Sequence, residues 1–274
     1  MRPIVFLTAI TLCHGVGYAA VPVVPATDSV YIGYEDFRWR EVTNTGFEVV
    51  DEYGPRYYLG LQENNFHGAR QGLLYGLNAA LWGGRVTYDG TTYDSVTMVY
   101  TPIQSTTDYY GGTASLSLGR RLAPFPLIPG LIPDYQLGVE GQYWKRDLAG
   151  GFNDLGQFAA GYSEYFGVAN LRLSLGLYHA LGRIRGYLRA GIKYPIYINE
   201  YVDNVDATLT PGALPSLYAD YEIRTVRLRN RNGLSLRAFY NSYRFTASNV
   251  VNGVHQPEST MESVGLRLEY YLER

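Results

Sequence analysis

Histidine is the side chain that most often performs acid–base catalysis near neutral pH, and this chain has only four. His14 lies in an apolar N-terminal segment. The other candidates are His67, His179 and His255, with Asp203, Asp206 and Ser259 as possible loop partners of His255. No spacing motif links these residues, and GxSxG, HExxH and Walker motifs are absent. A loop histidine without such a motif is more often solvated than catalytic, so we expect no enzyme.

Patterns that bind cofactors or metals are equally weak. Residues 199–206 mix asparagine, aspartate and tyrosine, and their oxygens could hold Ca²⁺, but a hydrated loop is the simpler interpretation. Cys13 is the only cysteine, which excludes a thiolate metal site and a disulfide. Lysine and arginine total 23 against 25 aspartates and glutamates, so nothing indicates nucleic-acid binding. We expect no cofactor and no metal.

Polar and apolar residues alternate along much of the chain, which predicts strands with one face of each kind. In Leu171–Tyr178, leucine occupies every odd position through Leu177. Ten such segments are predicted: 28–41, 47–63, 72–90, 106–121, 134–147, 161–180, 183–200, 216–230, 233–247 and 259–273. They exceed the usual soluble strand of about 5–6 residues. They suit tilted strands that cross a bilayer, which need about 9–11 residues there.

The connections in the second half alternate in length. Ala180–Gly182 and Arg231–Gly233 are short, and Asn-Gly in the latter is a hairpin signal. The links 148–160, 201–215 and 248–258 are long, as in barrels with short periplasmic turns and long outer loops. The Pro-rich link 123–130 breaks this pattern, and residues 91–104 could hold an extra hairpin. About ten strands are therefore expected, with eight or twelve as alternatives.

The N-terminus has the three parts of a secretory signal peptide. Arg2 precedes the largely apolar run Ile4–Cys13, and the small residues Ala19 and Ala20 follow. This run is shorter than the roughly 20 residues that a membrane-spanning helix needs. We expect residues 1–20 to be a cleaved signal peptide and residues 21–274 to form one barrel domain. A buried first strand, a short membrane anchor or lipidation at Cys13 are weaker alternatives.

Tyrosine is abundant, with 27 residues, and gathers near predicted strand ends, as in the aromatic girdles of membrane barrels. The clustered positions are Tyr162, Tyr165, Tyr194, Tyr197, Tyr201, Tyr218, Tyr221, Tyr240, Tyr243, Tyr270 and Tyr271. Together with the signal peptide and the alternating last strand Ser263–Leu272, they make the chain similar to bacterial outer-membrane β-barrel proteins, the broad porin-like and OmpA-like class. Members of that class commonly end on an aromatic residue, whereas this chain continues to Arg274.

This resemblance implies an all-β, antiparallel up-and-down transmembrane barrel in the outer membrane of a Gram-negative bacterium. Its expected partners are outer-membrane lipids and, during biogenesis, the barrel-insertion machinery and periplasmic chaperones. A soluble β-sandwich or adhesin domain is the alternative fold.

If the leucine-rich faces point to lipid, the charged faces point into the lumen, because an arginine or lysine facing the bilayer midplane costs about 2–4 kcal/mol. The predicted lumen residues are Glu140, Glu164, Arg172, Arg185, Arg189, Lys193, Glu222, Arg224, Arg237, Arg267 and Glu269. They either brace a filled barrel through arginine–carboxylate pairs or line a wet pore that prefers anions. Ten strands lie nearer the filled end of the size range, which favours the brace.

The function expected from these features is passive: passage of small solutes or ions, or a structural role in the envelope. Two alternatives remain. One is a surface-binding or adhesin barrel that acts through its outer loops. The other is an outer-membrane protease or lipid-modifying enzyme, which the absence of a motif around the histidines does not favour.

Overall fold

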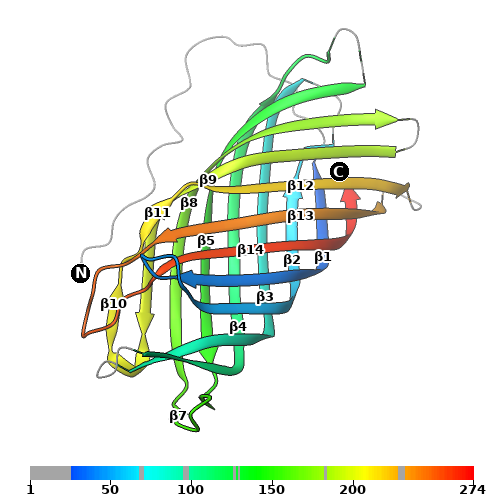
Figure 1. Ribbon diagram of the computed structural model, residues 1–274. Coiled ribbons are helices and arrows are strands. Elements are labelled where there is room, and N and C mark those ends of the chain that lie inside the picture. Colours follow the sequence, from blue (N-terminus) through cyan, green and yellow to red (C-terminus); the bar gives the residue numbers. More distant parts are fainter. Residues whose placement is uncertain are drawn as a thin grey trace, which may run out of the picture.

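The computed structural model describes residues 26–67, 71–94, 99–125, 128, 130–181, 184–227 and 232–274. The expected signal peptide lies outside the described residues. Ten long strands dominate the chain (Figure 1). They are β1 (Thr27–Val42), β2 (Glu48–Asn64), β3 (Gly72–Asp94), β4 (Val99–Arg121), β5 (Leu131–Leu148), β8 (Tyr162–Leu181), β9 (Ile184–Val202), β12 (Ser216–Arg227), β13 (Asn232–Thr246) and β14 (Glu258–Glu273).

Each long strand pairs antiparallel with its neighbours in the chain, and β14 pairs with β1 over all 16 residues of β1. Because β8 also pairs with β9, the sheet closes on itself. The fold is therefore the predicted up-and-down barrel with ten wall strands, and both described ends of the chain lie at the same end of it, here called the terminal end.

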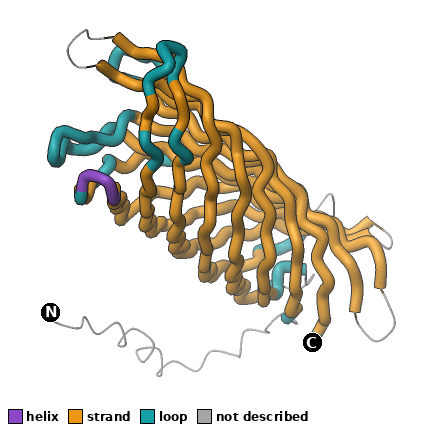
Figure 2. The backbone as a smooth tube through the Cα atoms, turned by 90° about the horizontal axis from the view of Figure 1, so that it is seen from below, coloured by secondary structure: helices purple, strands orange, loops and turns teal. Residues whose placement is uncertain are grey.

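The opposite end, here called the distal end, carries the small elements. These are β6 (Gly151–Phe152), β7 (Phe158–Ala159), the 3-10 helix η1 (Asp203–Val205), β10 (Ala207–Leu209) and β11 (Gly212–Leu214). Figure 2 shows η1 and the longer loops at the end away from the C-terminus. Among the described residues, no helix is long and apolar enough to cross a membrane.

The structure settles two open points about the strands. Residues 91–94 and 99–104 extend β3 and β4, each of which has 23 residues, so they do not add a strand pair to the wall. The Pro-rich link follows β4 and joins it to β5 at the terminal end. The wall therefore has ten strands, and the pattern that resembled a separate hairpin in the sequence belongs to the long ends of β3 and β4.

A belt of exposed apolar side chains surrounds the barrel near the terminal end, here called the membrane band. It includes Val30, Ile32, Leu61, Leu137 and Leu173, which point outward. Tyr34, Tyr57, Tyr110 and Tyr143 point outward along its distal margin. Farther on, outward ion pairs such as Arg38–Asp51 and Arg85–Asp108 replace the apolar residues. This order matches a hydrocarbon layer, an interfacial girdle and then water.

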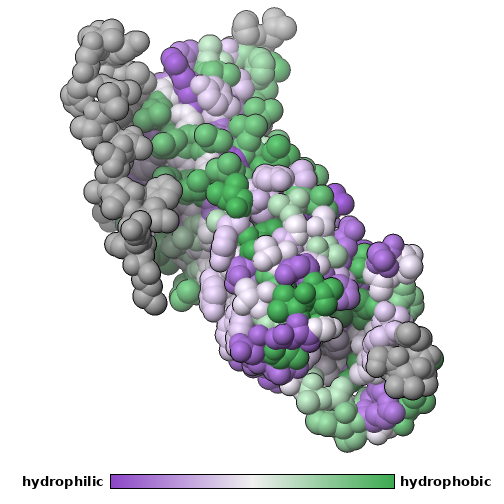
Figure 3. All heavy atoms as spheres, turned by 90° about the vertical axis from the view of Figure 1, so that its left-hand side faces the viewer, coloured by the Kyte–Doolittle hydropathy of each residue, from purple (hydrophilic) through white to green (hydrophobic). Residues whose placement is uncertain are grey.

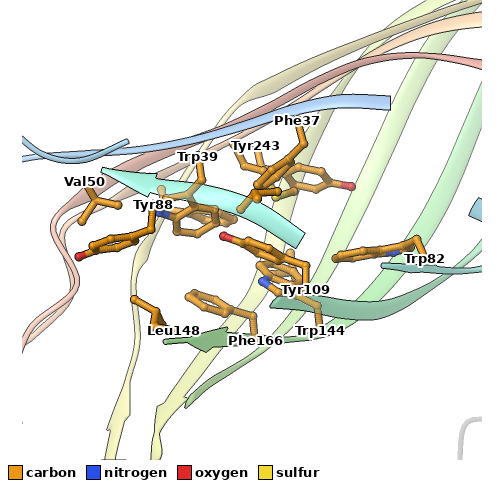
Figure 4. Close-up of a cluster of buried hydrophobic side chains, with 14 of the residues drawn as sticks. Phe37, Trp39, Val50, Trp82, Tyr88, Tyr109, Trp144, Leu148, Phe166 and Tyr243 are labelled. Atoms are coloured by element: carbon orange, nitrogen blue, oxygen red, sulfur yellow. The ribbon is translucent and has the colours of Figure 1, made fainter. Parts of the chain in front are cut away.

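Beyond that girdle, in what is here called the distal half, the alternation inverts. Charged residues face outward, and a buried aromatic cluster fills the inside (Figure 4). Trp144 stacks on Phe166 with ring centroids 4.8 Å apart, and Trp39 meets Phe166 edge-on at 5.4 Å. The distal half therefore has a hydrophobic core like that of a water-soluble protein.

The tyrosine prediction is correct only in part. Tyr194, Tyr197 and Tyr270 point outward and are exposed, as a girdle requires. Tyr218, Tyr243 and Tyr271 are buried inside the barrel, so their assignment to the girdle is wrong. Proximity to a strand end does not determine which way a side chain points, because successive residues face opposite sides.

Candidate functional site: the charged lumen

The eleven lumen residues predicted from the sequence lie on β5, β8, β9, β12, β13 and β14. Ten of them form four groups along the barrel, one of which is Arg267 alone, and Arg185 lies apart from these groups. The side chains of all eleven are buried or half-buried inside the barrel. Arg185 lies at the terminal rim, where its Nη1 donates to Glu273 Oε1 at 3.1 Å.

The first group forms a layer near the terminal end. Glu222 accepts hydrogen bonds from Arg224 Nε at 2.8 Å and from Arg237 Nη2 at 2.6 Å. The Nε atom of Arg237 lies 3.0 Å from Glu269 Oε1. The imidazole of His67, which enters from the β2–β3 turn, lies 3.0 Å from Glu222. Two arginines thus share two carboxylates, which offsets the cost of burying each charge.

The second group lies at the middle of the barrel. Glu140 accepts from Arg172 Nη1 at 2.8 Å and from the Tyr243 hydroxyl at 2.6 Å, and Lys193 Nζ is 3.7 Å away. Nearby, Arg189 donates to Asp220 at 2.9 Å. Most charges here have a partner of opposite sign.

Arg267 is the exception among the predicted residues and forms the third group by itself. Its guanidinium packs among the rings of Tyr31, Tyr58 and Phe239, with centroid distances of 4.9, 5.4 and 4.6 Å. Among the described residues, no carboxylate lies within ion-pair distance of it. Arg267 also lies directly opposite Arg237 across the β13–β14 ladder, and like charges in that position repel.

The fourth group contains Glu164 and lies in the distal half. Arg146 is fully buried and binds three carboxylates: Glu164 at 2.6 Å, Glu52 at 2.9 Å and Glu41 at 3.0 Å. Glu52 also accepts from Thr107 at 2.8 Å and from the Tyr109 hydroxyl. Sequence reasoning assigned only Glu164 to the lumen and missed the arginine at its centre.

Sequence reasoning also missed two charge pairs on the first five strands. Arg56 binds Glu35 at 2.5 Å beneath the aromatic cluster, and Arg121 binds Asp134 at 3.2 Å near the terminal end. The signal was present, because Glu35 alternates with the outward residues Tyr34 and Asp36. It was hidden because, farther along the same strand, the inward positions hold Phe37 and Trp39, which look like a lipid-facing pattern.

Burial in the distal half favours the neutral form of two carboxyl groups. Removal from water raises the pKa of Glu164 to about 7, against the opposing effect of Arg146. Removal from water also raises the pKa of Glu200 to about 10, and the neighbouring Glu164 adds to this. One arginine among four nearby carboxyl groups is too little positive charge to keep all four ionised.

A cavity of about 100 Å³ remains in the middle of the lumen. It is lined by four arginines (Arg172, Arg189, Arg237 and Arg267) and two acids (Glu140 and Asp220), together with amide and hydroxyl groups. Buried layers close the lumen on both sides of it. Trp39, Glu52, Trp144 and Tyr243 are fully buried on the distal side, as are Leu74, Glu222 and Glu269 on the terminal side.

The histidine site considered from the sequence does not assemble. His255 is exposed in the β13–β14 loop. Its three candidate partners are engaged elsewhere: Asp203 with the Ser163 amide, Asp206 with Tyr201, and Ser259 with Gln256. His179 contacts Tyr221 at 2.8 Å. In the described part of the chain, no cluster of histidine, cysteine or acidic residues has the arrangement of a metal site.

No protein-family model matches the chain, and no characterised protein matches it in sequence. In structure, the chain is similar to the outer membrane protease OmpT from Escherichia coli, with a TM-score of 0.58 and 13% identity over 93% of this chain and 99% of that one. It is more distantly similar to the β-domain of the Bordetella autotransporter BrkA, with a TM-score of 0.39 and 14% identity over 90% and 100% of the two chains. It also resembles the outer membrane protein OprG from Pseudomonas aeruginosa, with a TM-score of 0.33 and 11% identity over 92% and 98%. At such identities the likeness shows the fold, which is that of bacterial outer-membrane β-barrel proteins.

Proposed function

We propose that this outer-membrane barrel is a closed, non-catalytic envelope protein whose charged lumen braces the wall instead of conducting solutes. The observation that carries this proposal is the pair of buried layers, one on either side of the central cavity. Their side chains come from strands all around the barrel and are nearly inaccessible to water. A water-filled channel would leave such side chains exposed along its length.

The pairing of the lumen charges supports a brace. Glu222 joins β12 to β13 through Arg237 and, through His67, to the β2–β3 turn across the barrel. Arg146 on β5 joins β1, β2 and β8 through its three carboxylates. Such networks connect strands that are not neighbours, so they resist changes in the cross-section of the barrel.

Single-channel recording in a planar bilayer tests this proposal. The wild-type barrel, refolded without residues 1–20, is expected to insert and to carry no steady current. The comparison is a variant with Trp39→Ala, Trp144→Ala and Phe166→Ala, in which removal of three buried rings from the distal layer is intended to open the lumen. Steady, ion-selective openings of the wild-type protein would contradict the closed barrel and would restore passive ion passage as its function.

A second candidate function, surface binding by the distal end, rests on exposed apolar residues beyond the membrane band. Phe152, Leu155 and Phe158, on and between β6 and β7, are 63–69% exposed, and the two phenylalanine rings lie 5.3 Å apart. Figure 3, which looks at the side of the molecule on the left of Figure 1, shows hydrophobic residues interspersed with hydrophilic ones. Exposed apolar residues in a water-facing region are typical of interaction sites.

Retention of cells on a hydrocarbon-coated surface tests the second function. Cells that display the wild-type protein should be retained, and the double variant Phe152→Ser, Phe158→Ser should lose most of that retention. The matched control is Tyr53→Ser, which removes an exposed aromatic ring from the distal wall. Equal retention of the double variant and the wild type would show that Phe152 and Phe158 do not contribute to binding.

A further inference from the structure

The central cavity has an excess of positive charge that the protein itself does not neutralise. Counting the described charges in and around it, seven cations face five carboxylates. The cations are Arg56, Arg172, Arg189, Lys193, Arg224, Arg237 and Arg267, and the carboxylates are Glu35, Glu140, Asp220, Glu222 and Glu269. Each carboxylate already contacts at least one cation. The excess positive charge is therefore carried by the cations that have no carboxylate to themselves.

Arg267 is where this excess is least compensated. The nearby carboxylate Glu35 is occupied, since it accepts from Arg56 Nε and from the Tyr58 hydroxyl, both at 2.5 Å. The carboxylates near Arg237, its cross-strand neighbour, bind Arg237 itself. The surrounding rings offer Arg267 only their faces, which attract a cation less strongly than a full negative charge does.

The walls of the cavity also present hydrogen-bond donors without acceptors. Gln62 is more than nine-tenths buried and lines the cavity, and its Nε2 has no partner within the protein. The Nε atoms of Arg172 and Arg267 also have no hydrogen-bond partner within the protein. One acceptor, Gln142 Oε1, also lacks a partner and needs a water molecule. Buried donors of this kind cost free energy unless a ligand or water satisfies them.

We propose that the cavity is a binding site for one small inorganic anion of the size and charge of chloride, held beside Arg267 and Gln62. A volume of about 100 Å³ accommodates such an ion with a few water molecules, since a water molecule takes up about 30 Å³ in the liquid. The anion separates the opposed guanidiniums of Arg237 and Arg267 and accepts from the unpartnered donors. It lies between the two buried layers and is a component of the folded barrel.

Bromide provides the direct test, because it has the charge of chloride and scatters anomalously. The refolded barrel is crystallised in sodium bromide, and an anomalous peak is expected in the cavity next to the Arg267 guanidinium. The Arg267→Gln variant should lose that peak, and the Arg185→Gln variant, whose change is at the terminal rim, should keep it. Water alone in the cavity of the wild-type crystal, with bromide found on the protein surface, would overturn the proposal.

A solution measurement covers the case in which Arg267→Gln does not fold. At equal ionic strength, the wild-type barrel should unfold at a higher urea concentration in chloride than in gluconate, which is too large for the cavity. At an anion concentration one hundred times the Kd, the ratio of folded to unfolded protein rises about 100-fold. Gln62→Leu keeps the lumen charge and should reduce the anion dependence, whereas Arg185→Gln should preserve it. The same midpoint in both salts for the wild type would contradict the site, whether or not the barrel conducts.

Discussion

The membrane band and the distal half are built from the same ten strands, but they place apolar and charged residues on opposite faces. In the membrane band the outside is apolar and the lumen is charged, whereas in the distal half the outside is charged and the lumen is aromatic. The sign of the buried charge also differs, since cations predominate in the band and carboxylates around Arg146. The solvent outside, lipid or water, therefore decides which residues a strand turns inward.

Loss of the central cation of the distal half should have the largest effect. Arg146→Met leaves Glu41, Glu52 and Glu164 buried without their shared partner, and breaking a buried pair costs about 3–5 kcal/mol. Urea unfolding in lipid vesicles would measure the loss in the free energy of unfolding. The control is Arg85→Met, which removes an exposed cation paired with Asp108 and should change little. Equal effects of the two substitutions would mean that the distal half has no core of its own.

Removal of an aromatic ring from the distal core tests whether that core behaves like a soluble one. Trp144→Ala removes a fully buried ring that stacks on Phe166, and such truncations cost about 3–5 kcal/mol. Tyr143→Ala, one position away and facing outward at the girdle, is the matched control. The unfolding midpoint should fall much more for Trp144→Ala. A larger fall for Tyr143→Ala would reverse the assignment of inside and outside on β5.

The position of the water boundary is tested by placing the same charge on the outside of each region. Leu173→Arg introduces a cation into the membrane band and should cost about 2–4 kcal/mol. Tyr53→Arg lies beyond the girdle near Asp51 and Asp89, where an exposed arginine should cause no measurable loss. Both are followed by unfolding in vesicles. A large loss for Tyr53→Arg would place the hydrocarbon boundary farther along the barrel.

The distal half should also depend on pH, because two of its buried carboxyl groups hold their protons in the folded state. Because the folded pKa values of Glu164 and Glu200 lie above those of an unfolded chain, the folded state holds the additional protons. Their contribution to stability is present in full below about pH 4.5 and is lost as pH rises through about 7 and 10. Resistance of the distal half to proteolysis should therefore decrease between pH 5 and pH 9. Glu200→Gln should reduce this decrease, and unchanged behaviour of that variant would argue against a neutral Glu200.

Much of the wall follows from the sequence, because strict alternation sets the faces of a strand once one face is known. The leucines of Leu171–Leu177 indicated the lipid side, and in the structure Arg172, on the opposite face, pairs with Glu140. On β1 the apolar residues change sides, from Val30 and Ile32 outside to Phe37 and Trp39 inside, without any change in period. Alternation alone carries no information about where the bilayer ends.

The pairings inside the lumen were beyond sequence reasoning for a related reason. Arg146 and Glu41 are 105 residues apart, and Tyr243 and Glu140 are 103 apart. Only the closed ring and its register bring them together. The composition could indicate that arginines and carboxylates share the lumen, but not which arginine would be left without a carboxylate.

The pairing of β14 with β1 has a kinetic consequence. The two strands are at opposite ends of the chain, so the contacts that close the wall have almost the largest sequence separation that this chain permits. Folds dominated by such distant contacts form slowly, because the chain must lose loop entropy before those contacts stabilise it. Until the last strand arrives, β1 and β13 present unpaired edges that can associate with other chains. Protection of those edges during assembly is therefore a requirement of the topology.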